Sequence, residues 1–244
     1  MPNVSPAVSI VVPCYGQAHV LGDALDSLAA QAFTDWACIV VAPHEQSEDV
    51  QRVLSRFSGA RIRTLPGHPH HEQNRPRLLL EPVANGPGSA RNFAIATTRS
   101  GYLLPLDADD MIAPGFLERT MRVLDDPGVS IAFTDVQCFG VDRHSWATGP
   151  FSREALVESN RLPYCALYRR EVWEALGGYR EGFCYEDWDF WLGAATLGFR
   201  ATSVREPLFF YRTGREPSRH AALRERHEDL AREVRERWPL ERTP

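Results

Sequence analysis

Three aspartates stand at the end of an apolar run in the segment LLPLDADD, residues 103–110. Asp107, Asp109 and Asp110 would repel one another, and a divalent cation would relieve that repulsion. An Asp-x-Asp pair supplies carboxylate oxygens for Mg²⁺ or Mn²⁺ and leaves coordination positions open for phosphate oxygens and water. The same side chains could instead cap a helix entering residues 114–124. The aspartates alone do not decide between a metal site and a helix cap.

A second acidic pair precedes an aromatic-rich segment, CYEDWDFWL, residues 184–192. Glu186 and Asp187 stand just ahead of an expected helix, whose Trp188 and Trp191 offer flat faces to a sugar or to core neighbours. Desolvation by tryptophans would raise the pKa of a nearby carboxyl group, and a raised pKa suits a general base. The segment is therefore a candidate for proton chemistry, although tryptophans more often belong to the core.

A glycine-rich turn in NGPGSARN, residues 85–92, offers a site for an anionic group. Free backbone N–H groups at a helix N-terminus, together with Arg91, suit a phosphate or a similar anion. An ordinary helix start would have the same pattern. The polar loop GHPHHEQNRPR, residues 67–77, carries three histidines that could bind a metal, but exposed loop histidines usually bind none.

Alternating strand and helix patterns must position these residues. Apolar runs predict strands, and apolar residues repeating every three to four positions predict helices. The expected strands cover residues 8–12, 36–41, 77–83 and 102–106, and the expected helices begin near Ala18, after Ser47 as N-cap, near Gly88 and at Pro114. This order predicts an α/β fold with a mostly parallel sheet covered by helices on both faces.

The order of the strands also predicts where a ligand binds. Ligands of open parallel sheets bind at the carboxyl ends of the strands. The loop with Pro13 and Tyr15 follows the first strand, and the DADD segment, residues 107–110, follows the strand at 102–106. Both are therefore expected to face one pocket.

After Asp126 the pattern changes to short strand-like runs, such as VSIAFTD at residues 129–135, and a turn at Gly177 and Gly178. This half is predicted to be α+β structure packed on the first half. The charged tail at 217–238 has apolar positions at helical spacing, which predicts an amphipathic helix docked on the body. Those positions are Leu223, His227, Leu230, Val234 and Trp238.

Composition excludes several other classes of protein. The 244 residues, 43% of them hydrophobic, suffice for one compact body, and the net charge of −5 gives no reason to expect a nucleic acid partner. Five cysteines without paired or CxxC spacing predict reduced buried thiols. The chain has no signal sequence and no apolar run of about 20 residues, so a cytoplasmic protein without a transmembrane segment is predicted, with peripheral membrane contact left open.

Four segments in this order carry a family resemblance. They are VSIVVPCYGQAHVLGDALDSLAAQ, NGPGSARNFAIATTRSGYLLPLDADDMIAPGFL, LYRREVWEALGGYREGFCYEDWDFWLGAATLGF and PLFFYR. From about residue 7 to residue 212 the chain resembles the family 2 glycosyltransferases of GT-A fold. The resemblance implies inverting transfer from a nucleotide-diphosphate sugar, with a UDP-sugar as first candidate and Mn²⁺ or Mg²⁺ as the metal. The implied acceptor is a sugar, a lipid-linked intermediate or a small molecule.

The resemblance also implies roles for the acidic residues. Asp109 would bind the metal that bridges the donor diphosphate, and Asp107 would lie near the ribose or in the metal shell. Asp110 would support its neighbours. Asp187 would deprotonate the acceptor hydroxyl, and Glu186 beside it would serve orientation or acceptor binding.

Further implications concern the donor and the organisation of the chain. Pro13 and Tyr15 would line the nucleoside pocket, with Arg91 as another candidate donor-binding residue. A single domain would cover residues 1–244. It would comprise a nucleotide-sugar-binding half at about 7–112, an acceptor and catalytic-base half at about 113–215, and an amphipathic helix at about 216–240.

One departure from the family pattern affects nucleoside recognition. The family commonly has an Asp-Asp-Gly-Ser type segment after its second strand, whereas APHEQSED, residues 42–49, has Ala42 and Pro43 at the acidic positions. Glu45 or His44 could take over that recognition.

A second departure affects the diphosphate. The family often has a histidine shortly after a Tyr-Arg pair, whereas Tyr211 and Arg212 are followed by Thr-Gly. The diphosphate would then meet Arg212, Arg215 or His220. The loop at 67–77 is an insertion that could shape access of the donor or acceptor to the site, or could simply be tolerated surface.

Two other functions compete with glycosyl transfer. The absence of acidic residues at positions 42 and 43 is consistent with a non-catalytic nucleotide-sugar-binding or partner module. A phosphatase with Asp107 as nucleophile is disfavoured, because Met111 stands where such enzymes usually have Thr or Val and the chain has no Lys. Retention of both acidic motifs favours an active transferase.

Overall fold

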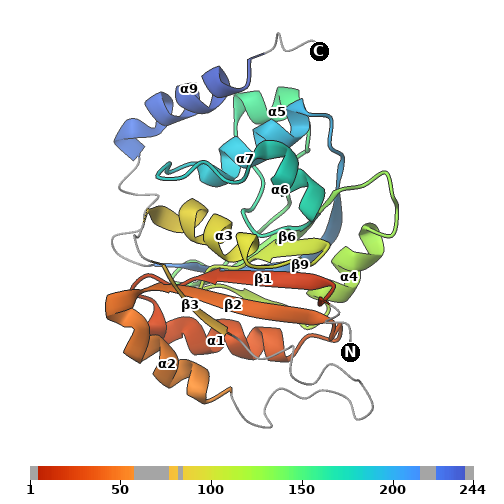
Figure 1. Cartoon of the computed structure of the whole chain (residues 1–244). Helices are drawn as coiled ribbons and strands as arrows, with labels where there is room; N and C mark the ends of the chain where they lie inside the picture. Colours follow the sequence, from red (N-terminus) through yellow and green to blue (C-terminus); the bar gives the residue numbers. More distant parts are fainter. Residues whose placement is uncertain (1–4, 58–76, 82–84, 215–223, 240–244) are drawn as a thin grey trace.

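The computed structural model describes residues 5–57, 77–81, 85–214 and 224–239 (Figure 1). Its strands form one nine-stranded sheet in the order β3-β2-β1-β4-β8-β6-β9-β5, and β7 pairs with β6. Helices cover both faces of this sheet. The predicted α/β class is therefore confirmed.

The first half alternates between strand and helix, as predicted. Its elements are β1 (Val8–Pro13), α1 (Ala18–Ala29), β2 (Trp36–Pro43), the short turn η1 (His44–Gln46), α2 (Ser47–Ser55), β3 (Arg77–Glu81), α3 (Gly86–Ala96) and β4 (Tyr102–Pro105). These four strands pair in parallel, with β1 between β2 and β4. All of β1 and β2 is buried, which explains why both strands are continuous apolar runs.

The second half is mixed. Its elements are β5 (Met111–Ile112), α4 (Phe116–Val123), β6 (Ile131–Gly140), β7 (Ser145–Trp146), α5 (Arg153–Glu158), β8 (Leu167–Arg169), α6 (Arg170–Leu176), α7 (Glu186–Thr196), β9 (Ala201–Thr213), the turn η2 (Arg224–Arg226) and α9 (His227–Arg237). β8 pairs antiparallel with β4 and β6, and β5 pairs antiparallel with β9. The long pair β6–β9 is parallel. One sheet therefore runs through both halves of the chain.

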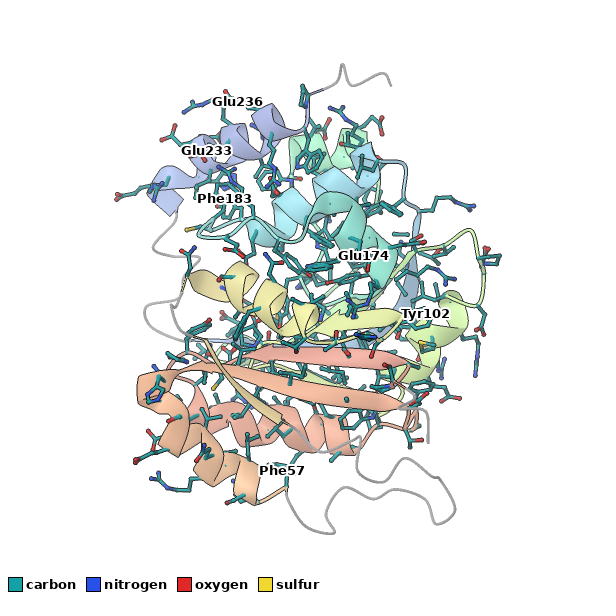
Figure 2. The ribbon with its side chains drawn as sticks, viewed as in Figure 1. Phe57, Tyr102, Glu174, Phe183, Glu233 and Glu236 are labelled. Atoms are coloured by element: carbon teal, nitrogen blue, oxygen red, sulfur yellow. The ribbon has the colours of Figure 1, made fainter. Side chains whose placement is uncertain are left out.

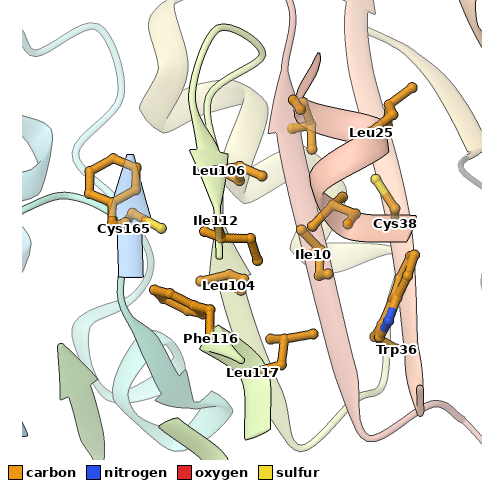
Figure 3. Close-up of a cluster of buried hydrophobic side chains, with 14 of the residues drawn as sticks. Ile10, Leu25, Trp36, Cys38, Leu104, Leu106, Ile112, Phe116, Leu117 and Cys165 are labelled. Carbon is orange, nitrogen blue, oxygen red and sulfur yellow. The ribbon is translucent and has the colours of Figure 1, made fainter. Parts of the chain in front are cut away.

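Two hydrophobic clusters lie on opposite faces of the sheet. Ile10 and Val12 of β1 belong to one cluster and Val11 to the other, because successive side chains of a strand point to opposite faces. The first cluster is covered by α1, α2 and α4, and Figure 3 shows Leu25 and Phe116 packing toward the strands there. The second is covered by α3, α5, α6, α7 and α9. The site-bearing helices α3 and α7 thus share one face.

Several predicted helix starts are corrected. Ser47 is not an N-cap but the first residue of α2, because η1 already turns the chain and Gln46 takes the cap position. Pro114 lies before α4, whose N-cap is Gly115. The helix expected from Gly88 begins at Gly86, with a proline in its first turn.

The predicted amphipathic tail helix is present as α9, His227–Arg237, within the described part of that stretch. Leu230, Val234 and Trp238 are buried, whereas His227, the first residue of α9, is exposed. Leu223 lies outside the described residues. The helix packs on α7, and a Cβ at Gly193 of α7 would clash with the ring of Trp238. Figure 2 labels Glu233 on α9, which forms a 3.0 Å ion pair with Arg180.

Other expectations have mixed outcomes. The five cysteines are free thiols, four of them buried, as expected. The polar loop at 67–77 lies outside the described residues except for its last position, which begins β3. Within the part of the chain that the structure describes, no helix is long and apolar enough to cross a membrane.

Candidate active site

The loops after β1, β2 and β4 meet at the carboxyl edge of the parallel strands. The backbone N–H of Gly16 donates to Gln46 Oε1 at 2.6 Å, which joins the loop after β1 to the turn after β2. Gln17 Nε2 lies 3.4 Å from Asp109 Oδ1 and joins the same loop to the DADD segment. The segments that the strand order predicts to share one pocket are therefore neighbours.

Asp110 is the anchor of the DADD segment. It is 1% exposed, and its carboxylate accepts hydrogen bonds from the Tyr164 hydroxyl and from the backbone N–H of Arg212, each at 2.7 Å. Burial, followed by the charges of Asp109 and Asp107, raises the pKa of Asp110 well above its ordinary value. The predicted supporting position of Asp110 agrees with these contacts.

The alternative reading of the aspartates as a helix cap is wrong. The N-cap of α4 is Gly115, and no side chain accepts a hydrogen bond at that cap. Between the DADD segment and α4 the chain forms β5, whose two residues pair with β9. The aspartates therefore precede a strand pair and not a helix start.

Asp107 and Asp109 are half-buried at the edge of the site. The backbone N–H of Asp107 donates to the Tyr164 hydroxyl at 2.8 Å, and Arg212 Nε donates to the backbone carbonyl of Asp109 at 2.8 Å. Burial raises the pKa of Asp107, the charge of Arg91 opposes that rise, and the charge of Asp109 adds to it. The site therefore penalises the negative charge of Asp107.

Arg91 of α3 links the two acidic motifs. Its side chain is 1% exposed, with Nη2 2.8 Å from Asp107 Oδ1 and Nη1 3.0 Å from Glu186 Oε1. Its guanidinium also lies over the rings of Tyr164 and Tyr179, at 5.0 and 5.4 Å from their centroids. Both terminal nitrogens of Arg91 bind carboxylates of the protein, and its expected contact with an anionic ligand stays a prediction.

The glycine-rich start of α3 serves close packing. A Cβ at Gly88 would lie 3.1 Å from the backbone carbonyl of Arg180 and 3.4 Å from Glu186 Cβ. The absence of a side chain at Gly88 lets α3 approach the segment that leads into α7. That approach brings Arg91 within reach of Glu186.

Asp187 lies in the first turn of α7 and is half-buried. Its Oδ2 accepts a hydrogen bond from Asn160 Nδ2 at 3.2 Å. Desolvation raises the pKa of Asp187, and a hydrogen bond from the Trp188 backbone and the charge of Arg91 oppose the rise. Glu186, 5% exposed, faces Arg91. Of the two acids, Asp187 is the one still partly open to solvent.

The tryptophans of α7 belong to the core. Trp188 and Trp191 are 3% and 0% exposed, and their indole N–H groups donate to the carbonyls of Leu156 and Pro163 at 2.7 and 3.1 Å. Neither ring is open to a sugar, so the stacking alternative is wrong. The tryptophans fix the position of α7 instead.

The expected nucleoside side of the site is less fully described. Pro13 is the buried end of β1, and Tyr15 is half-buried in the following loop. His44 is exposed at the start of η1; Glu45 is in the same turn, and its side chain lies outside the described part of the structure.

The residues expected near the diphosphate are only partly described. Arg212 is held by Asp23, with Nη2 at 2.7 Å from Oδ2, and stacks on Phe139 at 4.5 Å from the ring centroid. Arg215 and His220 lie outside the described residues.

The carboxylates at this edge fit a divalent cation as partial ligands. Within the described ranges, no group of three or more His, Cys, Asp or Glu side chains could hold a metal ion alone. Asp107 and Asp109 supply hard oxygen donors, and burial, with a further contribution from the charge of Asp109, raises the pKa of Asp107. A cation here would take its other ligands from a bound phosphate or from water.

Sequence reasoning missed Tyr164 and Asn160. Tyr164 contacts Asp107 and Asp110, and Asn160 contacts Asp187. Both lie in the irregular stretch between α5 and β8, which has no motif of its own. Only their contacts in the folded chain identify them.

Comparison with solved structures defines the class of fold. The chain aligns with S. aureus TarS 1–349 in complex with UDP-GlcNAc at a TM-score of 0.70 and 16% identity, over 93% of this chain and 65% of that one. It aligns with the mannosyltransferase PcManGT from Pyrobaculum calidifontis, in complex with GDP-Man and Mn²⁺, at 0.66 and 20%, over 94% and 63%. The fold is that of the GT-A glycosyltransferases.

The sequence then identifies the family. Residues 9–177 match the profile of glycosyl transferase family 2, and the chain belongs to that family. A curated relative, the O-antigen biosynthesis protein RfbC of Myxococcus xanthus, is 24% identical over 217 residues, which cover 86% of this chain and 16% of RfbC. The chain thus spans less than two thirds of each of these three proteins.

Proposed function

We propose that this chain transfers a sugar from a nucleotide-diphosphate sugar to an acceptor hydroxyl, in a metal-dependent single displacement that inverts the anomeric centre. The observation that supports this most directly is the Arg91 bridge, which holds the DADD segment and the Glu186–Asp187 pair at one edge of the sheet. A donor site and a proton acceptor must be neighbours for such a displacement.

Asp187 is the proposed general base. It is partly open to solvent, held by Asn160, and has a raised pKa because of desolvation. A carboxylate with a raised pKa takes a proton more readily than an ordinary aspartate. Asp187 would accept the proton of the acceptor hydroxyl as that oxygen attacks the anomeric carbon, and no enzyme nucleophile is then needed. An α-linked donor would yield a β-linked product.

Asp109 and Asp107 are the proposed metal ligands. A Mn²⁺ or Mg²⁺ ion bound there would neutralise charge on the departing diphosphate. Asp110 and Tyr164 hold the backbone of the segment, so the orientation of both ligands depends on them. Glu186, paired with Arg91, would orient the first turn of α7.

Pro13 and Tyr15 would line the nucleoside, together with Glu45 or His44. A UDP-sugar is the first candidate donor, and the UDP-GlcNAc complex of TarS is consistent with it, although PcManGT binds GDP-Man. The name of RfbC supports an acceptor in polysaccharide or glycoconjugate biosynthesis. A cytoplasmic location and peripheral membrane contact stay predictions.

Binding and transfer assays test this function. Purified protein would be screened by thermal shift against UDP-, GDP- and TDP-sugars with Mn²⁺, and donors that raise the melting temperature would be assayed for hydrolysis and transfer. We expect at least one donor to bind in a metal-dependent way and to be turned over. Calorimetry could instead show that donor affinity is the same with and without Mn²⁺, while no acceptor yields a product. That result would support the non-catalytic module suggested by Ala42 and Pro43.

A further inference from the structure

Tyr211 lies beside the DADD segment, although no motif assigns it a role. In the pairing of β5 with β9, Met111 is opposite Phe210, so the next position along β9, Tyr211, runs past Asp110. The backbone N–H of Arg212 donates to Asp110 Oδ1 at 2.7 Å. Tyr211 is therefore fixed at the border of the proposed metal site by backbone contacts on both sides.

The Tyr211 side chain continues an aromatic row that leads out of the core. Alternate residues of a strand share a face, and the Tyr211 ring lies 6.3 Å from that of Phe209, centroid to centroid. Phe209 in turn packs edge-on against Tyr164 at 5.4 Å, and the Tyr164 hydroxyl binds Asp110. Tyr211 thus lies on the same side of β9 as the DADD segment.

The Tyr211 side chain is exposed, whereas its neighbour Phe209 is buried. Tyr211 is 40% exposed and is the only aromatic ring among the large exposed hydrophobic side chains of the described residues. Partial burial, followed by the charges of Asp110, Asp107, Asp109 and Asp187, raises its pKa. The phenol therefore lies in the field of both acidic motifs, and within the described ranges no hydrogen bond of its hydroxyl is found.

We propose that Tyr211 is a donor-positioning residue, whose ring packs against the transferred sugar and whose hydroxyl donates a hydrogen bond to the sugar diphosphate. The inference rests on the proposed function. Aromatic faces pack well on apolar surfaces, and a protonated phenol is a donor suited to an anionic oxygen. The donor is favoured over the acceptor because Tyr211 adjoins Asp110 and Arg212, which hold the proposed metal-binding segment.

Two substitutions separate the ring from the hydroxyl. Tyr211→Phe removes only the hydroxyl, and Tyr211→Ala removes both. Tyr102→Phe is the matched control. Tyr102, labelled in Figure 2, is the first residue of β4, whereas the DADD segment follows the other end of that strand. The Tyr102 hydroxyl contacts Arg169 at 3.3 Å. Calorimetry would measure the binding of UDP and of UDP-glucose, each with Mn²⁺, and kinetics would give KM for donor and acceptor. If GDP and its sugar are the ligands found in the screen, they replace UDP and UDP-glucose.

We expect Tyr211→Phe to weaken binding of the free nucleoside diphosphate about tenfold, through loss of a hydrogen bond to a charged group. Tyr211→Ala should weaken binding of the nucleoside diphosphate by the same factor as Tyr211→Phe. It should weaken binding of the nucleotide sugar by a further factor of about 3–10, because the ring contact is then lost. The acceptor KM of both Tyr211 variants should stay at the wild-type value. The binding and kinetic constants of Tyr102→Phe should also equal those of the wild type.

Several outcomes would overturn the inference. Wild-type-like binding of both ligands by the two Tyr211 variants contradicts the assignment of Tyr211 alone, and so does a rise confined to acceptor KM. A wild-type protein that binds no nucleoside diphosphate with Mn²⁺ contradicts the proposed function and the inference with it. If Tyr211→Ala does not fold, the UDP affinity of Tyr211→Phe still decides the hydroxyl contact, because that variant keeps the ring and its packing on Phe209.

Discussion

Arg91 Nη1 lies 3.0 Å from Glu186 Oε1, and the two residues are 95 positions apart in the chain. The same guanidinium binds Asp107 at 2.8 Å. One buried charge therefore joins the segment proposed to hold the donor to the segment proposed to activate the acceptor. Burial raises the pKa of Asp107 and the charge of Arg91 opposes that rise, so the bridge favours the ionised form of Asp107.

Removal of the Arg91 charge should destabilise the protein and abolish activity. Arg91→Met leaves the buried Glu186 and the half-buried Asp107 without their cation, and loss of one partner of a buried ion pair costs about 3–5 kcal/mol. Denaturant unfolding measures the free energy of unfolding. The control is Arg52→Ala, which removes an exposed pair with Asp49 and should cost less than about 1 kcal/mol. Equal losses in the free energy of unfolding for both substitutions would show that the Arg91 bridge stabilises the protein no more than an exposed ion pair.

Asp187→Asn should lower kcat about 10²–10⁴-fold and leave donor affinity near the wild-type value. The amide keeps the shape and the contact with Asn160 but cannot take the acceptor proton. Steady-state transfer kinetics, with calorimetric donor binding alongside, measures both quantities. An unchanged kcat would remove Asp187 from the role of base.

The pH dependence of kcat/KM should reflect the ionisation of Asp187. A base works only when deprotonated, so activity should rise as pH increases through its pKa. Desolvation raises that pKa above the ordinary value of 3.8, so the acid limb should lie at a higher pH than an ordinary aspartate would give. Loss of this limb in the residual activity of Asp187→Asn would identify its source. A limb at an ordinary aspartate pH would contradict the raised pKa.

Asp109→Asn should raise the Mn²⁺ concentration that supports half-maximal nucleotide binding by at least about tenfold. An amide oxygen is a weaker and neutral ligand for a hard cation. Titration of Mn²⁺ into EDTA-treated protein with saturating nucleotide measures this constant. Asp125→Asn, at an exposed aspartate just after α4, is the matched control and should not change it. Equal metal dependence in both variants would place the metal elsewhere.

Tyr164→Phe should weaken metal binding through the backbone of the DADD segment. The hydroxyl both donates to Asp110 and accepts from the N–H of Asp107, so its loss removes the acceptor of that N–H and leaves Asp110 with the hydrogen bond from Arg212. We expect about 1–3 kcal/mol of lost stability and a higher Mn²⁺ requirement. Lost stability without any change in the Mn²⁺ titration would limit Tyr164 to a purely structural role.

Local sequence patterns predicted the strands of the fold better than the starts of its helices. The runs at 8–12 and 36–41 predicted β1 and β2, because strands buried on both faces need apolar residues at every position. Helix starts were less accurate, as at Ser47 and Pro114. A single turn or strand pair near the start, such as η1 or β5, shifts a boundary without changing the periodicity.

By itself, the sequence determined the α/β class, the family resemblance and the acidic residues that could do the chemistry. Only the tertiary structure decided which groups those residues contact. Arg91 binds Glu186, and the tryptophans of α7 are buried in the core. Tyr164, which no motif marks, contacts Asp110, and Tyr211 packs beside Phe209. The spacing of apolar residues along the chain indicates which side chains are buried. It does not indicate which distant residues meet, because that depends on the order of strands in the sheet. Arg212 and Asp110, for example, are 102 residues apart and hydrogen-bonded.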